Sequence, residues 1–382
     1  MKQTQFTDKD FDDIRPYRDS ELKPILNKLT QHPILIKGFR IIQFRKWPQY
    51  THNFLEWWIK FFLRIKFRPI HTVAEFQTKI IVKNVLDNVI KKSTTSFSCS
   101  GIDNLEHTIP YFYISNHRDI TLDSAFANYF LEKNNMIVSE IAFGDNLLFN
   151  DIVSDLIRLN RSFTVKRNLP RRELITESLK LSHYIYNTLH NGRSIWIAQK
   201  EGRAKDGDDR TNPAIFKMLY FSQRKNKIPF KDFLHSINIV PIAISYEYDP
   251  CDRLKGWELF RKKKYGKYNK RKNEDLISIH AGMRLNKGGV HVCFCPQIKG
   301  TFKNERKIAE EVDAYIHKYY YLWPTNYIAY DLFKQANKYQ NKYTLAQYEK
   351  FESRFENLHP EVKQIIIKSY AMPVINKETI EK

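Results

Sequence analysis

The fold is decided by the stretch at residues 109–123, IPYFYISNHRDITLD. Its first six residues are apolar or aromatic, which predicts a short buried strand. A polar loop follows, and residues 120–132 then carry apolar side chains at helical spacing. A buried strand that leads through a polar loop into a helix is the repeating unit of α/β folds.

The same unit recurs across residues 96–303. Further strands are predicted over residues 137–143, 163–165, 194–198, 237–246 and 289–298, with helices over 147–159 and 171–190. Parallel strands need helical crossovers, so this alternation predicts an α/β domain with a largely parallel central sheet flanked by helices.

The regions on either side, residues 1–95 and 304–382, lack strand patterns, and we expect them to be helical extensions. Two helices are predicted in the first region, over 54–67 and 71–91. In the helix over 54–67, Glu56, Lys60 and Arg64 form one narrow polar stripe, and Phe and Trp cover most of the remaining circumference. Such a helix either packs in a core or lies at a membrane interface, and both readings stay open. The C-terminal region contains the distinctive run LWPTNY at 322–327.

The composition is strongly basic. Lys and Arg number 63 against 42 Asp and Glu, a formal net charge of +21. This charge favours an anionic partner such as a phospholipid surface, nucleic acid or a phosphorylated substrate. Residues 261–272, RKKKYGKYNKRK, interleave Tyr with cations and would suit an anionic membrane or single-stranded nucleic acid.

Other features bear on the compartment. The four cysteines are too few and too scattered for a disulfide framework, and we expect them to be reduced and to bind no metal. The N-terminus lacks the apolar run of a signal peptide, and nowhere do about 18 consecutive residues stay apolar. We therefore expect a cytoplasmic protein that does not span a bilayer.

His117 is the candidate catalytic residue, because it follows a predicted strand at the sheet edge where α/β enzymes collect reactive groups. An imidazole can act as general base when a carboxylate orients it. Asp119 and Asp123 are both close in sequence, and Asp119 also suits a helix N-cap. A structural histidine fits these residues equally well.

Other chemistries find less support. His117-Arg118-Asp119 mimics the kinase catalytic loop, but Ser124 stands where that motif has Asn, and the Gly-rich loop and Asp-Phe-Gly motif are absent. No Gly-x-Ser-x-Gly elbow is present. Direct transfer assisted by a base remains. Lys166-Arg167 and residues 200–205 place cations after two further strands, where they would clamp a phosphate or remain solvated loop charges.

Four segments in order resemble the glycerolipid acyltransferases of the lysophospholipid acyltransferase superfamily, which includes glycerol-3-phosphate and 1-acylglycerol-3-phosphate acyltransferases. The segments are Asn116–Asp123, Gly144–Leu148 with Phe163–Arg167, Glu201–Arg203, and Val240–Glu247. Any one segment would be weak support, whereas four in order over about 105–250 are specific.

The resemblance implies the fold of these enzymes and transfer of a fatty acyl group from a thioester to a hydroxyl of lysophosphatidate or glycerol-3-phosphate, in phospholipid biosynthesis. It implies no metal and no cofactor beyond the co-substrate, an acyl-CoA or acyl carrier protein thioester. The catalytic residues would be His117 with Asp123 or Asp119. The residues implied in acceptor binding are Arg118, Asn146, Lys166, Arg167, Glu201, Gly202 and Arg203.

Two departures from the family pattern concern the site. Five residues, rather than four, separate His117 from Asp123, so either the helix start carries a bulge or Asp119 takes part. Arg203 follows Gly202 directly, where the family has one residue between. A lyso-lipid acceptor without phosphate, such as an amino-acid lipid, is therefore an alternative. A basic nucleic-acid-binding protein is the alternative of another class, but it leaves the four segments unexplained. We expect the enzyme at the inner face of an anionic membrane, with no nucleic-acid partner.

Overall fold

The computed structural model describes residues 6–44, 48, 51–147, 150–167, 169–271 and 273–381. The chain forms two compact units. The first unit comprises Met1–Val85 and Glu140–Glu177, and the second comprises Leu86–Ser139 and Ser178–Lys382. The boundaries of these units differ from the divisions expected near residues 95 and 303. Those expected divisions stay a prediction.

The second unit is built on five strands in the order β1-β7-β6-β2-β5. Their bounds are β1 Ser96–Ser100, β2 Phe112–Ser115, β5 Ile195–Ala198, β6 Ile239–Tyr246 and β7 Gly289–Phe294. Every pairing among them is parallel except that of β6 with β7. The predicted α/β class with a largely parallel sheet is confirmed. Ser115 of β2 lies opposite Ala198 and Ile242, so β2, β5 and β6 point their carboxyl ends to the same edge.

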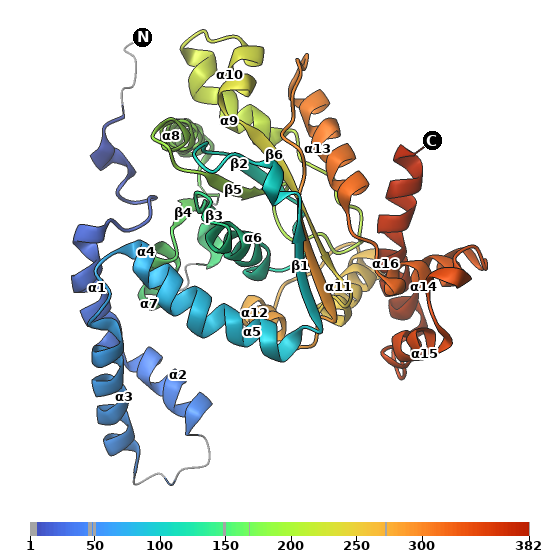
Figure 1. Ribbon diagram of the computed structural model, residues 1–382, viewed down its shortest axis with the longest axis horizontal. Coiled ribbons are helices and arrows are strands. Elements are labelled where there is room, and N and C mark those ends of the chain that lie inside the picture. Colours follow the sequence, from blue (N-terminus) through green and yellow to red (C-terminus); the bar gives the residue numbers. More distant parts are fainter. Residues whose placement is uncertain are drawn as a thin grey trace. The chain divides into compact units, whose positions relative to one another are not determined.

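Helices flank these strands (Figure 1). They are α5 Asp87–Ser93, α6 Leu122–Lys133, α8 Arg171–His190, α9 Ala214–Lys225, α10 Phe230–Ser236, α11 Asp252–Tyr265 and α12 Glu274–Arg284, with a 3-10 turn, η4, over Ile102–Asn104. The helix predicted over 171–190 is confirmed as α8. The helix predicted from residue 120 begins at Leu122 instead.

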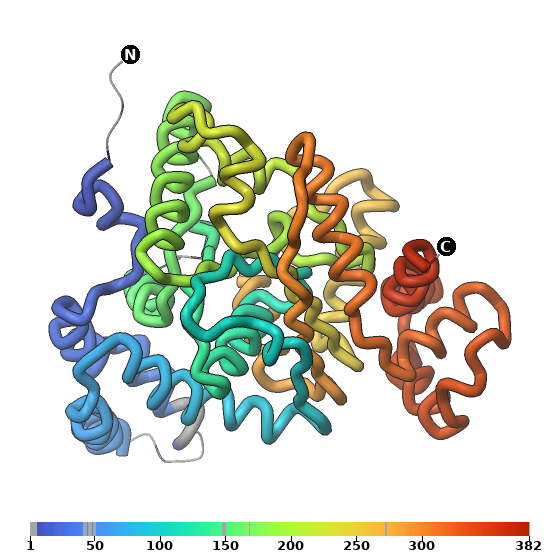
Figure 2. Tube along the Cα trace, turned by 45° about the horizontal axis from the view of Figure 1, so that its top comes forward, coloured from blue at the N-terminus to red at the C-terminus, as the bar shows by residue number. Residues whose placement is uncertain are grey.

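The C-terminal region is helical, as expected. It contains α13 Glu305–Tyr319, α14 Pro324–Lys334, the 3-10 turn η6 Gln340–Lys342, α15 Leu345–Ser353 and α16 Pro360–Ile380. Helices α14, α15 and α16 lie together in both views (Figures 1 and 2), and Ile328, Phe351 and Ile366 share one hydrophobic cluster with Phe260 of α11.

The run LWPTNY docks this extension onto the sheet. The Trp323 ring lies so close to Gly289 of β7 that a Cβ there would come within 2.1 Å of it. The backbone N–H of Trp323 donates to Asn326 Oδ1 at 2.8 Å, which caps α14, and Thr325 Oγ1 donates to the carbonyl of Glu247 at 2.8 Å. The distinctive residues of this run therefore anchor α14 beside β7 and the end of β6.

The first unit is mainly helical. It contains η1 Asp8–Phe11, α1 Asp19–Gln31, α2 Pro33–Gln43, α3 His52–Phe67, α4 Val73–Phe76, η5 Asp145–Leu147, α7 Asp151–Leu159, β3 Glu140–Gly144 and β4 Ser162–Val165. Strands β3 and β4 pair in parallel, with Gly144 opposite Val165. The helix predicted over 71–91 is confirmed as helical over Val73–Ser93, where α4 and α5 flank a π-helix, η3, over Gln77–Leu86.

Helix α3 has two different faces. Leu55, Ile59 and Leu63 are buried, at i, i+4 and i+8, and the last two cluster with Ile36 of α2. Helices α2 and α3 lie side by side in both views (Figures 1 and 2). The opposite face is apolar and exposed; its residues are Phe54, Trp57, Trp58, Phe61, Phe62 and Ile65, between 41% and 61% exposed. Within the described ranges, none of the helices combines the length and apolarity needed to cross a membrane.

Candidate active site

His117 lies in the loop directly after β2, and its ring Nδ1 is 2.9 Å from Asp123 Oδ2. Asp123 is the second residue of α6 and its side chain is fully buried, whereas the His117 side chain is 14% exposed. The extra residue between them is taken up in the non-helical loop, because α6 begins only at Leu122. The structure therefore pairs His117 with Asp123 in spite of the long spacing.

Asp123 receives hydrogen bonds on both carboxylate oxygens. Oδ2 also accepts the backbone N–H groups of Arg118 at 2.6 Å and Asp119 at 2.9 Å, and Oδ1 accepts the Tyr246 hydroxyl at 2.8 Å. This set of donors suits a buried carboxylate anion. An anion facing Nδ1 keeps the proton on that nitrogen and leaves Nε2 as the basic atom. Nε2 has no hydrogen-bond partner among the residues that the structure describes.

Tyr246 was not predicted as a site residue. It is the last residue of β6 and lies four positions beyond Ile242, the partner of Ser115, at the carboxyl edge where His117 also lies. Burial and the Asp123 charge raise the pKa of Tyr246 well above 10.0, so the phenol is a neutral donor. Its strand-end position in a parallel sheet was the signal that could have found it.

Asp119 organises the start of α6. Its Oδ1 accepts the backbone N–H groups of Thr121 at 3.0 Å and Leu122 at 2.9 Å. Its Oδ2 is buried without a hydrogen-bond partner in the described residues, and a Cβ on Gly282 of α12 would come within 2.3 Å of it. Burial, together with the Asp123 charge, raises the pKa of Asp119, while the backbone hydrogen bonds and Arg203 oppose the rise.

The loop after β5 runs beside the His117 loop. The N–H of Gln199 donates to the carbonyl of Ser115 at 2.8 Å, and that of Ala204 donates to the carbonyl of His117 at 2.7 Å. Within this loop Glu201 and Gly202 are exposed, and Gly202 has a φ of +72° that favours glycine.

Arg203, in the same loop, is partly buried. One terminal nitrogen donates to Ser278 Oγ at 3.1 Å, and Nη1 is buried with no partner in the described part of the chain. Because the next residue, Ala204, donates its N–H to the carbonyl of His117 at 2.7 Å, Arg203 places a cation close to the His117 loop.

The Arg118 side chain is buried and paired with a carboxylate, whereas an acceptor-binding residue should present a free donor to the substrate. Its guanidinium donates to Asp209 Oδ2 at 2.5 Å, and its side chain is only 10% exposed. The Tyr320 ring lies 5.6 Å from the guanidinium carbon. The charge of Arg118 is therefore neutralised by Asp209, which the sequence did not point to.

Asn146, Lys166 and Arg167 belong to the first unit. Asn146 and Arg167 come together at the carboxyl ends of β3 and β4, since a Cβ on Gly144 would lie 2.5 Å from Asn146 Oδ1 and 3.2 Å from the Arg167 guanidinium. Lys166 instead forms ion pairs with Asp13 at 2.5 Å and Glu177 at 3.2 Å. Leu148, from the same sequence block, lies outside the described residues.

Two other sequence features have structural outcomes. In the basic segment, Lys262 pairs with Glu258 at 2.7 Å and Lys270 pairs with Asp275, while Lys263 is 74% exposed; residue 272 lies outside the described ranges. The four cysteines are free. Across the described residues there is no group of three or more His, Cys, Asp or Glu side chains that could hold a metal ion.

The α/β fold with a carboxylate-oriented histidine at a strand end fits a base-assisted transferase. The family model described as Acyltransferase matches residues 96–245, so this segment carries the acyltransferase match that the four segments predict. The match includes His117, Asp123 and Arg203 and stops before the C-terminal extension.

Among solved structures, the chain is similar to the crystal structure of the 1-acyl-sn-glycerophosphate (LPA) acyltransferase, PlsC, from Thermotoga maritima. The two are 13% identical, the alignment covers 77% of this chain and 93% of that one, and the TM-score is 0.35. No curated protein matches the chain.

Proposed function

We propose that this acyltransferase moves a fatty acyl group from an acyl thioester to a hydroxyl of a glycerophosphate-type acceptor, lysophosphatidate or glycerol-3-phosphate, in phospholipid biosynthesis. The observation that carries the proposal is the 2.9 Å contact between His117 Nδ1 and buried Asp123, with Nε2 left unpaired among the described residues. This is the arrangement that a general base requires.

In the proposed reaction, Nε2 takes the acceptor's hydroxyl proton while the oxygen attacks the thioester carbonyl. The new C–O bond forms, the C–S bond breaks, and the imidazolium returns the proton to the departing thiolate. Asp123 stabilises the transient imidazolium, a role worth on the order of 10⁴-fold in kcat in serine proteases. Besides the acceptor, the reaction needs only the co-substrate, acyl-CoA or an acyl carrier protein thioester.

The acceptor's phosphate would bind at Arg203. Its buried and unpaired Nη1 is the group that a phosphate oxygen would satisfy, since guanidinium groups bind phosphate through paired N–H donors. By resemblance, Glu201 and Gly202 would contribute from the same loop as Arg203. Asn146, Lys166 and Arg167 belong to the first unit and stay acceptor-binding residues implied by the resemblance; Lys166 is already paired with two carboxylates there.

The test is a panel of acceptors. Purified protein is incubated with labelled acyl thioester and glycerol-3-phosphate, lysophosphatidate or a lyso-lipid without phosphate such as an amino-acid lipid, and the product is identified. Labelled phosphatidate or lysophosphatidate is the expected product. Transfer only to the phosphate-free acceptor, unaffected by Arg203→Met, would overturn the glycerophosphate assignment.

We further propose that the enzyme works in the cytoplasm, attached peripherally to the inner face of an anionic membrane through α3. Six large apolar side chains on one helix face make a surface suited to the headgroup region of a bilayer. Lys60, Arg64 and Lys66 lie on the same helix, and each cation near an anionic surface contributes on the order of 1 kcal/mol.

Vesicle flotation tests this attachment. Trp57→Ser with Phe61→Ser should weaken binding to anionic vesicles, because both rings are at least half exposed and their loss should leave the fold intact. Leu345→Ser, at a residue that is 73% exposed on α15, is the matched control and should bind like the wild type. Equal binding by all three proteins would contradict the role of α3.

A further inference from the structure

We propose that the C-terminal extension supports the catalytic loop through a brace, formed by Asp209 and its loop in contact with α13 and α16. The brace holds both neighbours of His117. Arg118 is thereby a positioning residue rather than a phosphate ligand. The inference rests on the proposed role of His117. It concerns α13 and α16, which lie outside the segment that matches the acyltransferase family.

The first link joins Asp209 to the residues on either side of His117. Asp209 Oδ2 accepts Arg118 Nη2 at 2.5 Å and Asn116 Nδ2 at 3.4 Å. Asn116 also exchanges two hydrogen bonds with the backbone of Ile244, at 2.8 and 2.9 Å. Asn116, Arg118 and Asp209 are all at least nine-tenths buried, so the backbone of His117 is fixed from both sides.

The second link joins the Asp209 loop to α13. The ring Nε2 of His317 lies 2.8 Å from the carbonyl oxygen of Asp209 and donates to it. Two residues later, the N–H of Thr211 donates to Asp313 Oδ1 at 2.7 Å. His317 and Asp313 are both buried on the same helix, so α13 sets the position of Asp209.

The third link is the contact of this loop with α16. Gly207 has a φ of +78°, and a Cβ on it would lie 2.0 Å from the carbonyl oxygen of Ser369. Asn376 Nδ2 donates to Asp208 Oδ1 at 3.4 Å. Only glycine allows the loop to approach α16 this closely.

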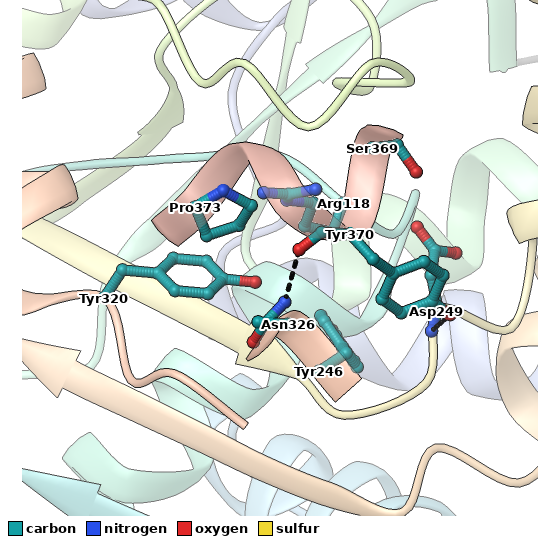
Figure 3. Close-up of a pocket in the computed structure, with 8 residues that line it drawn as sticks. All are labelled: Arg118, Tyr246, Asp249, Tyr320, Asn326, Ser369, Tyr370 and Pro373. Carbon is teal, nitrogen blue, oxygen red and sulfur yellow. Dashed lines mark hydrogen bonds between the residues drawn. The ribbon is translucent and has the colours of Figure 1, made fainter. Parts of the chain in front are cut away.

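The space around Arg118 does not suit a substrate. Arg118 faces a cavity that Tyr320 and, from α16, Ser369, Tyr370 and Pro373 also line (Figure 3). The cavity leaves about 20 Å³ for the centres of water molecules, which is room for about one. Lys255 Nζ donates to the carbonyl of Arg118 at 2.7 Å, so the backbone at Arg118 is held as well. A glycerophosphate would not fit in this cavity. The close packing around Arg118 suits a residue that holds the loop in position.

Gly207→Ala tests the link to α16, with Gly192→Ala as its matched control. Both glycines have a left-handed φ, +78° and +77°, but a Cβ on Gly192 meets nothing within 4 Å. Gly207→Ala should lower kcat by on the order of 10²-fold, the effect of an ångström-scale misplacement, with the acceptor KM within about two-fold. Gly192→Ala should keep both constants. Equal kcat values for the two variants would overturn the proposal.

A second comparison separates positioning from phosphate binding and decides the matter even if Gly207→Ala fails to fold. Arg118→Met and Asp209→Asn should each lower kcat to the same extent with phosphate-bearing and phosphate-free acceptors, and Arg118→Lys should recover part of the loss. Arg203→Met should instead raise KM for the phosphate-bearing acceptor. A selective rise in that KM for Arg118→Met, with kcat unchanged, would show that Arg118 binds phosphate.

A readout independent of turnover distinguishes failure of this inference from failure of the proposed function. The imidazole resonances of His117 should shift in Gly207→Ala and Asp209→Asn and stay in place in Gly192→Ala. A wild-type protein that acylates no acceptor in the panel overturns the proposed function, but the resonances still test the brace. Unchanged resonances in both variants would overturn the brace whatever the activity.

Discussion

Replacing Tyr246 with Phe removes one hydroxyl from the support of the catalytic pair. That hydroxyl donates to Asp123 Oδ1 at 2.8 Å, and Tyr246 is 4% and Asp123 0% exposed. A hydrogen bond to a charged group contributes about 1.5–3 kcal/mol, and water cannot easily replace it here. We therefore expect the free energy of unfolding to fall by about 2 kcal/mol.

The catalytic effect of Tyr246→Phe should be moderate. Oδ2 keeps its contacts with His117 and the two backbone N–H groups, so the imidazole stays oriented. If about half of the lost energy, about 1 kcal/mol, is felt in the transition state, kcat/KM falls about five-fold, since about 1.4 kcal/mol corresponds to a factor of ten.

Tyr113→Phe is the matched control. Tyr113 is fully buried on β2, and its hydroxyl has no hydrogen-bond partner among the described residues, so its removal should leave stability and kcat/KM near wild type. Urea unfolding and steady-state kinetics on the three proteins give the answer. If Tyr246→Phe behaves like Tyr113→Phe in both measurements, the Tyr246 hydroxyl does not support Asp123.

Two further predictions concern the remaining buried charges. Asp123→Asn should lower kcat by on the order of 10²–10⁴-fold, and by no more than His117→Ala, because the amide no longer favours a proton on Nδ1. Asp119→Asn keeps an acceptor for the N–H groups of Thr121 and Leu122 and should cost less than about ten-fold. A larger loss in Asp119→Asn than in Asp123→Asn would reverse the assignment. Burial lowers the pKa of Lys287 from 10.5 to about 8. Between these two pH values the unfolded chain binds more protons than the folded chain. The free energy of unfolding therefore rises by at most about 3 kcal/mol as the pH increases from 8 to 10.5. Lys287→Met should flatten this part of the stability–pH curve, and an unchanged slope in urea unfolding would contradict the buried-ammonium explanation.

Much of the fold could be predicted because its signals are local. Apolar runs fixed the expected positions of β2, β5 and β6, and helical periodicity gave α8 its bounds. β1, with the sequence SFSCS, carries little apolar signal and forms by pairing with β7, almost two hundred residues away. The stretch over 71–91 has helical periodicity, but periodicity does not reveal a π-helical turn.

Part of the candidate site could also be predicted, because some of its signals are local in the sequence. His117 could be found from its place after a strand, and the blocks around Arg203 and Arg167 from their order. The choice between Asp119 and Asp123 depends on where α6 begins, which a spacing rule does not give. The brace through Asp209 and the burial of Arg118 could not be predicted. Both depend on contacts with α13 and α16, and no local sequence pattern indicates these contacts.

The central claim is that His117 is the base of an acyl transfer, and single-turnover transfer from labelled acyl thioester to lysophosphatidate or glycerol-3-phosphate measures it directly. The wild type should form labelled product, and His117→Ala should do so more slowly by a factor on the order of 10²–10⁴ with an unchanged unfolding curve. Transfer by a folded His117→Ala protein at close to the wild-type rate would contradict the account.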